Sequence, residues 1–131
     1  MFAGGLVTVF VTDMDRSVRF YTEQLGLKLS QRYENHFAMI DAGRGFMIGL
    51  HPTGTAAPAS NPKTGISISL SLTGSIEDAV ATLKGRGVNF VGSIINEGKA
   101  GKFAFLADPD GNSLYLAEIK AEYKDEAAGV R

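Results

Sequence analysis

The chain gathers its candidate metal-binding oxygens in one short stretch, ADPDGNSLYLAE, which spans residues 107–118. Asp108, Asp110 and Asn112 surround one glycine, and carboxylate and amide oxygens of this kind are typical ligands of Ca²⁺. An EF-hand loop places its glycine at the sixth position, whereas here the glycine is the fourth residue counted from Asp108. Proline, aspartate, glycine and asparagine are also the residues that favour tight turns. The stretch therefore predicts a hairpin turn, and its clustered carboxylates do not indicate a calcium site.

Two histidines, His36 and His51, are the other side chains suited to proton transfer or metal binding. If the hairpin between them closes symmetrically on Gly43–Arg44, the two imidazoles face each other across neighbouring strands. Such a pair would be able to hold a metal or share a proton. Both histidines also lie near a predicted strand end, so separate and solvated side chains are the interpretation that we favour.

The composition is that of one ordinary folded domain. The chain has 131 residues, a formal net charge of −1 and no cysteine, which excludes a disulfide framework, a thiolate nucleophile and a zinc–thiolate site. Its lysines and arginines are dispersed, so we expect no nucleic-acid partner. The sequence has no apolar run of membrane-spanning length and no basic signal-peptide start, so we expect no membrane partner and a cytoplasmic location.

Hydrophobic periodicity predicts a strand, a helix and three more strands in the first half of the chain. Residues 6–11, LVTVFV, have the composition of a strand. The helix that follows can be capped by Thr12 or Asp13 and is stopped by Gly26. The three further strands are expected at about residues 28–33, 37–41 and 46–51.

The same order of elements returns after residues 52–65, PTGTAAPASNPKTG, which have the composition of a connector or a mobile lid. Residues 66–72, ISISLSL, alternate strictly and predict a strand. Ser75 with Asp78 forms a capping box for the second helix. Three more strands are expected at about residues 89–96, 102–107 and 113–118.

The two halves can be laid over each other as an internal repeat. LVTVFVT matches SISLSLT and MIGL matches SLYL, which places Leu6 opposite Ser67 and Gly49 opposite Tyr115. A period of about sixty residues is too long for a solenoid repeat and fits two βαβββ units. The predicted fold is therefore α+β, one domain of two modules. Their expected bounds are about 5–52 for module one, 53–64 for the linker, about 65–119 for module two and 120–131 for a tail.

With VTDMDRSVRFYTEQLGLKL in the first half and DPDGNSLYL near the end, the chain resembles the vicinal oxygen chelate superfamily. This superfamily includes glyoxalase I, bleomycin-resistance proteins, fosfomycin-resistance enzymes and extradiol dioxygenases. The resemblance covers nearly the whole chain. It implies two βαβββ modules whose sheets form a half-open mixed β-barrel around a ligand cavity, with the helices outside. It also implies a homodimer.

The resemblance assigns four positions to the metal ligands of the metal-using relatives, on the first and fourth strands of each module. A histidine seven residues before Asp13 corresponds to Leu6, and a glutamate on the fourth strand corresponds to Gly49. A second histidine corresponds to Ser67, and a glutamate three residues after Asn112 corresponds to Tyr115. Leucine and glycine side chains offer no donor atom, and serine and neutral tyrosine are poor substitutes for imidazole and carboxylate. We therefore expect no metal and no other cofactor.

Strand alternation indicates which side chains line the predicted cavity. Val7, Val9 and Val11 form one apolar face, so the residues between them face the other way. The same parity in the other strands gives a mixed pocket suited to an amphiphilic organic molecule. The candidate ligand-binding residues are Leu6, Thr8, Phe10, Met47, Gly49, His51, Ser67, Ser69 and Tyr115.

The function that these residues favour is metal-free binding of a small organic ligand, with a possible role in sequestration or resistance. No catalytic residue can be assigned, because no activated nucleophile is recognisable. The alternative is an enzyme of the lyase, isomerase or dioxygenase type, with a metal-free site or with displaced ligands from His36, His51 or Glu118. A third possibility is an interaction module whose cavity is filled by its own side chains, Phe10, Met47 and Tyr115.

Overall fold

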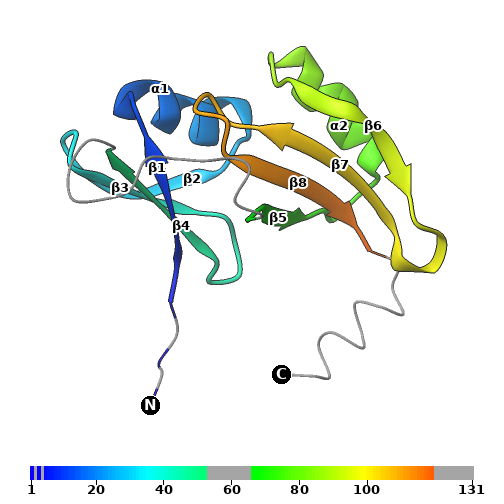
Figure 1. The fold of residues 1–131 in the computed structure, drawn as a ribbon, viewed down its shortest axis with the longest axis horizontal. Helices are drawn as coiled ribbons and strands as arrows, with labels where there is room; N and C mark the ends of the chain where they lie inside the picture. The colour runs from blue at the N-terminus through cyan, green and yellow to red at the C-terminus, as the bar shows by residue number, and fades with distance from the viewer. Residues whose placement is uncertain (2, 4, 53–65, 120–131) are drawn as a thin grey trace. The chain divides into compact units, whose positions relative to one another are not determined.

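The computed structural model describes residues 1, 3, 5–52 and 66–119, which form two compact units. The first unit contains the chain up to Gly65 together with the segment Asp108–Asn112, and the second contains the rest. Each unit has a four-stranded mixed sheet with helical structure against one face (Figure 1). The predicted α+β class with two βαβββ modules is confirmed. The predicted linker at 53–64 and tail at 120–131 lie outside the described residues.

The first sheet has the strand order β1-β4-β3-β2. β1 runs parallel to β4, whereas β3 is antiparallel to both of its neighbours. The bounds are β1 Val7–Val11, β2 Lys28–Tyr33, β3 Phe37–Asp41 and β4 Met47–Pro52.

The helical segment of the first unit consists of α1, Met14–Arg19, and a π-helical turn η1, Phe20–Gln24. Asp13 caps α1, because its carboxylate accepts a hydrogen bond from the Arg16 N–H at 3.0 Å. The π-helical turn was not predicted. It is closed by the Leu25 N–H, which donates to the Phe20 carbonyl at 2.9 Å. In this wider turn two consecutive aromatic residues, Phe20 and Tyr21, are both buried.

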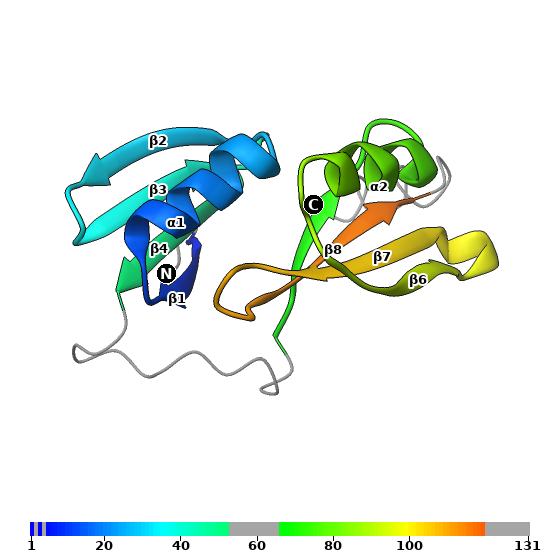
Figure 2. The same ribbon diagram turned by 90° about the horizontal axis from the view of Figure 1, so that it is seen from above.

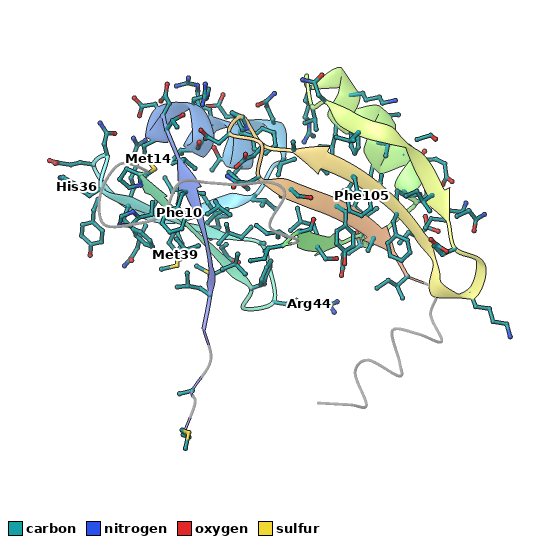
Figure 3. All side chains as sticks on the ribbon, in the orientation of Figure 1. Phe10, Met14, His36, Met39, Arg44 and Phe105 are labelled. Atoms are coloured by element: carbon teal, nitrogen blue, oxygen red, sulfur yellow. The ribbon has the colours of Figure 1, made fainter. Side chains whose placement is uncertain are left out.

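Alternation along the first sheet separates a buried face from an open one. Val9, Ala38 and Leu50 lie in register on neighbouring strands and are buried on the face that α1 covers (Figure 2). Met14 lies between α1 and the sheet, whereas Met39 lies on the opposite face (Figure 3). The open face of the first sheet therefore carries the intervening residues of each strand.

The second sheet repeats this topology, with the order β5-β8-β7-β6 and with β5 parallel to β8. Its helix is α2, Ile76–Gly85, whose N-cap Ser75 accepts a hydrogen bond from the Asp78 N–H at 3.1 Å. A short 3₁₀ turn, η3 at Gly98–Ala100, joins β6 to β7. The strand bounds are β5 Ile68–Ser71, β6 Phe90–Asn96, β7 Lys102–Ala107 and β8 Ser113–Glu118.

The strand registers bear out the internal repeat. Thr8 pairs with Gly49 in the first sheet, and Ser69 pairs with Tyr115 in the second. Thr8 and Ser69 are therefore equivalent positions. Leu6 and Ser67 each lie two residues before them, so they are equivalent too, as the sequence match predicts. Gly49 and Tyr115 likewise occupy the same place in the two sheets.

Candidate functional site

On the open face of the first sheet, Gly49 is covered by the side chains of Leu6 and Phe37. A Cβ atom built on Gly49 would lie 3.1 Å from the Leu6 Cδ1 atom and 3.1 Å from two ring atoms of Phe37. The position that the resemblance assigns to a glutamate is therefore covered by two apolar side chains. Any longer side chain at Gly49 has to displace the Leu6 and Phe37 side chains.

The other predicted residues of the first sheet lie on the same face without a shared polar centre. Thr8 is exposed and pairs with Gly49, and Met47 pairs with Asp41. The Phe10 ring meets the His51 ring edge-on, with centroids 5.9 Å apart. The Nδ1 atom of His51 lies 3.0 Å from the Pro52 carbonyl oxygen.

The two histidines do not form a facing pair. Ala42 and Phe46 close a three-residue loop, because the Ala42 N–H donates to the Phe46 carbonyl at 2.9 Å. Ala38 pairs with Leu50, so the same register places Phe37, and not His36, opposite His51. The condition for a facing pair, a symmetric closure on Gly43–Arg44, is therefore not met, because the register differs by one residue. The His36 side chain is 83% exposed, and its Nε2 atom is 3.9 Å from a carboxylate oxygen of Glu34.

The open face of the second sheet carries a cluster of three aromatic rings. The Tyr115 ring lies 5.0 Å from the Phe105 ring with an interplanar angle of 34°, and 6.0 Å from the Phe103 ring at 69°. All three side chains are partly exposed. At the end of the same strands the hydroxyl oxygens of Ser67 and Ser113 are 2.7 Å apart. Ser69, the third predicted residue of this sheet, is exposed beside Tyr115.

Two charged residues beside the second sheet have structural partners. A carboxylate oxygen of Glu118 accepts a hydrogen bond from the Ile76 N–H at 2.6 Å and so helps to cap α2. The Lys102 ammonium donates to Glu77 at 2.8 Å. This hydrogen bond lowers the pKa of Glu77 and raises the pKa of Lys102. Glu118 is therefore engaged as a cap and is not a displaced metal ligand.

The residues present do not fit the metal site of the metal-using relatives. Leu6 and Gly49 provide no donor atom, and Ser67 and Tyr115 provide neutral hydroxyls in place of imidazole and carboxylate. Within residues 5–52 and 66–119, no three histidine, aspartate or glutamate side chains are grouped so that they could hold a metal ion. We accordingly derive no chemical step through a metal.

The acidic stretch Asp108–Asn112 is a tight turn held by side chains of the first unit. The Gly111 N–H donates to the Asp108 carbonyl at 2.9 Å, and Gly111 has φ +83°. The Asp108 carboxylate is buried. One oxygen accepts from the Asp110 and Asn112 N–H groups at 2.9 and 2.8 Å, and the other accepts from the Tyr21 hydroxyl and the Asn112 side-chain amide, both at 2.9 Å. The prediction of a turn is confirmed.

Burial raises the pKa values of both Tyr21 and Asp108. Desolvation raises the pKa of Asp108, and the hydrogen bonds that its carboxylate accepts from Asn112, Tyr21 and Asp110 act in the opposite direction. Desolvation also raises the pKa of Tyr21 well above its usual value, and the neighbouring Asp108 carboxylate adds to that rise. Asp110 completes the turn, because it accepts a hydrogen bond from the Thr12 N–H at 3.0 Å and lies 3.4 Å from Arg16.

Sequence reasoning missed three aromatic residues of the open faces: Phe37, Phe103 and Phe105. The signal was present, because Phe103 and Phe105 share one parity in the strand KFAFLA and the repeat aligns Phe37 with Phe103. The partnership of Tyr21 with Asp108 was also missed. These residues are 87 positions apart, and no local pattern links them.

The model of the Glyoxalase/Bleomycin resistance protein/Dioxygenase superfamily matches residues 5–116. Comparison with the curated proteins gave no match. Among solved structures, the lactoylglutathione lyase from Agrobacterium tumefaciens is similar with a TM-score of 0.71 and 14% identity, over 88% of this chain and 92% of that one. A glyoxalase/bleomycin resistance protein/dioxygenase from Nocardioides has a TM-score of 0.67 and 23% identity, over 92% and 87% of the two chains. A protein of the same description from Alicyclobacillus acidocaldarius has a TM-score of 0.69 and 21% identity, over 91% and 92%. None of the described helices is long and apolar enough to cross a membrane.

Proposed function

Since the chain belongs to the Glyoxalase/Bleomycin resistance protein/Dioxygenase superfamily, we propose that it is a ligand-binding member that binds a planar organic molecule without a metal. The proposed site is the open face of the second sheet. A biological role in sequestration or resistance would follow from binding alone, because retaining a toxic molecule requires no reaction.

The observation that carries this proposal is the cluster of Phe103, Phe105 and Tyr115. Partly exposed aromatic rings on one sheet face offer stacking surface to a planar ligand. A well-placed aromatic pair contributes about 0.5–1.5 kcal/mol beyond the burial of its area. The aromatic side chains are also held by the sheet, so that little side-chain entropy is lost when a ligand binds.

Hydroxyl groups beside the rings provide the polar part of the site. Within the described chain the Tyr115 hydroxyl has no hydrogen-bond partner, so it is free to donate to a ligand oxygen. Ser69 is exposed next to it, and the Ser67–Ser113 hydroxyl pair can exchange its mutual hydrogen bond for one to a ligand. Apolar surface with a few convergent polar groups is typical of small-molecule sites. Ser67, Ser69 and Tyr115 thus enter the proposal, and the ligand-binding role of the first-sheet residues stays a prediction.

The alternative of an enzyme with displaced ligands has no observation in its favour. Its three candidate ligands were His36, His51 and Glu118. His36 is largely exposed in a turn, His51 contacts Phe10, and Glu118 caps α2. Among the described residues, none of these three side chains belongs to a group of three or more histidine, aspartate or glutamate side chains that could hold a metal ion.

A titration with 8-anilinonaphthalene-1-sulfonate, a fluorescent probe that contains a planar naphthalene ring, tests the proposal, with metal-free bleomycin as an unlabelled competitor. We expect Tyr115→Ala to weaken probe binding about tenfold, because one stacking partner and its buried area are lost. Tyr33→Ala is the matched control, since Tyr33 is 62% exposed on β2 in the first unit. Circular dichroism would establish that both variants are folded. Equal probe affinity for folded Tyr115→Ala and the unmodified protein would refute the proposed site.

A further inference from the structure

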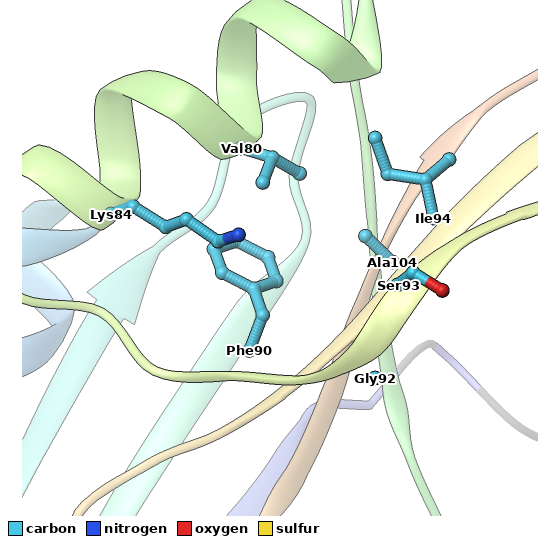
Figure 4. Close-up of a pocket in the computed structure, with 7 residues that line it drawn as sticks. All are labelled: Val80, Lys84, Phe90, Gly92, Ser93, Ile94 and Ala104. Carbon is cyan, nitrogen blue, oxygen red and sulfur yellow. The ribbon is translucent and has the colours of Figure 1, made fainter.

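The second unit has a recess on the helix side of its sheet, away from the aromatic face. It has a volume of about 340 Å³ and lies between α2 and β6 (Figure 4). This volume is at the lower end of the range of about 300–1,000 Å³ that is typical of small-molecule pockets. The residues that line it are Val80 and Lys84 of α2, Phe90, Gly92, Ser93 and Ile94 of β6, and Ala104 of β7.

An irregularity in β6 creates the recess. Val91 pairs with Phe105 and Ile95 pairs with Phe103, so four steps along β6 span only two steps along β7. The extra residues form a bulge, and bulges bend the strand away from its partner. Gly92 lies in this bulge with φ +75°, a conformation that favours glycine, and a Cβ atom there would meet no heavy atom within 4 Å. The bulge and the small residues Gly92 and Ser93 leave this edge of the helix–sheet contact open.

The walls of the recess combine apolar surface with one positive charge. Val80, Ile94 and the Phe90 ring supply the apolar surface. The Lys84 side chain extends from α2 so that its nitrogen lies by the Phe90 ring, whereas the Ser93 hydroxyl on β6 points away from that nitrogen (Figure 4). No carboxylate in the described part of the chain forms an ion pair with Lys84, in contrast to Lys102, which pairs with Glu77. Among the described residues, the recess therefore presents an ammonium group without a carboxylate partner next to an apolar surface.

From this arrangement we propose that the recess between α2 and β6 is a binding site for a small apolar monocarboxylate. The apolar part of the ligand packs against Val80, Phe90 and Ile94, and its carboxylate accepts a hydrogen bond from the Lys84 ammonium. Charge complementarity favours an anion over a neutral molecule of the same shape. This site shares none of its lining residues with the proposed aromatic site, and it does not rest on the proposed function.

The test is a titration of the ¹⁵N-labelled full chain with 3-phenylpropanoate, followed through backbone amide chemical shifts. We expect saturable shifts at Lys84, Gly92 and Ser93, with a dissociation constant of about a millimolar for a probe of this size. The neutral isostere 3-phenylpropan-1-ol and the variant Lys84→Gln should each weaken binding roughly two- to fivefold, the range for a partly solvated ion pair. Lys28→Gln is the matched control, because Lys28 is an exposed lysine on β2.

Three outcomes would overturn the proposal. The first is the absence of saturable shifts at the recess. The second is equal affinity for the acid and the alcohol, or for Lys84→Gln and Lys28→Gln. The third is a set of shifts confined to Phe103, Phe105 and Tyr115, which would assign the probe to the aromatic face and leave the proposed function standing without this second site.

Discussion

The hydrogen bond from the Tyr21 hydroxyl to Asp108 should stabilise the fold measurably, and Tyr21→Phe removes it with the smallest possible change of shape. The donor–acceptor distance is 2.9 Å, and Tyr21 is fully buried. A hydrogen bond to a charged group contributes about 1.5–3 kcal/mol. Asp108 keeps three other hydrogen bonds in the variant, from Asp110 and Asn112, so we expect a loss near the lower limit, about 1.5–2 kcal/mol. For a chain of this length such a loss corresponds to a fall in Tm of roughly 5–10 °C.

The effect should depend on pH in a defined direction. Burial raises the pKa of Asp108 in the folded state, so its contribution to stability is fully present below the unfolded pKa of about 4 and is lost as the pH rises through the folded pKa. The Tyr21 hydrogen bond favours the ionised carboxylate and limits that loss. Tyr21→Phe should therefore destabilise the protein more at pH 7 than at pH 4, because a larger fraction of Asp108 is protonated at the lower pH.

Urea unfolding followed by circular dichroism at both pH values measures these differences. Tyr33→Phe is the matched control, because Tyr33 lies exposed on β2, and its free energy of unfolding should stay within about 0.5 kcal/mol of the unmodified protein. The reasoning is refuted if Tyr21→Phe is as stable as Tyr33→Phe at pH 7. It is equally refuted if the destabilisation is larger at pH 4 than at pH 7.

Three further changes test other parts of the structure. Gly101→Ala should lower the free energy of unfolding by about 2–4 kcal/mol in urea titrations. The reason is that Gly101 has φ +114° and that a Cβ atom there would collide with the Glu118 carbonyl oxygen. An unchanged midpoint would contradict the backbone conformation of Gly101 just before β7. Glu77→Gln should leave the midpoint of urea unfolding nearly unchanged at low salt and unchanged at 1 M salt, since the Lys102–Glu77 pair is exposed and screened by salt. A large fall in the midpoint that does not depend on salt would contradict this. Untagged protein should keep its Tm within about 1 °C in excess chelator, because the four positions assigned to metal ligands hold no competent donor set; stoichiometric metal together with a chelator-dependent fall in Tm would contradict this.

The elements whose signals are local could be predicted closely from the sequence. The predicted bounds of β2, β3, β7 and β8 agree with the structure, because alternation and turn residues act over only a few positions. Ser75 was identified as a helix cap, and Asp13 as one of two candidates with Thr12, for the same reason, since a cap is determined by residues up to three positions away.

Features that depend on long-range geometry could not be predicted in this way. The hairpin between β3 and β4 has a three-residue loop in which Arg44 adopts φ +53°, whereas the facing pair of histidines required a closure centred on Gly43–Arg44. One residue of difference reverses which side chains share a face, so the facing His36–His51 pair that depended on this closure does not form. The carboxylate partner of Tyr21 was likewise invisible, because the turn that supplies it comes from the other half of the sequence.

The two equivalent positions Gly49 and Tyr115 show why a ligand is expected at one sheet in particular. In the first sheet the side chains of Leu6 and Phe37 close over the glycine, and no phenol takes the place that Tyr115 has in the second sheet. In the second sheet the large residue is Tyr115 itself, and its neighbour equivalent to Leu6 is the small, polar Ser67.

The exchange of a leucine and a glycine for a serine and a tyrosine keeps side-chain bulk on both faces but changes its chemistry. Bulk at Leu6 serves packing against Gly49, whereas the ring at Tyr115 meets Phe103 and Phe105 and retains a phenol that can donate. Specific recognition of a small molecule requires both contact area and directional polar groups. The second face combines them in the rings of Phe103 and Phe105 and the phenol of Tyr115, and so the module that carries a tyrosine in place of the family's carboxylate is where binding should be sought.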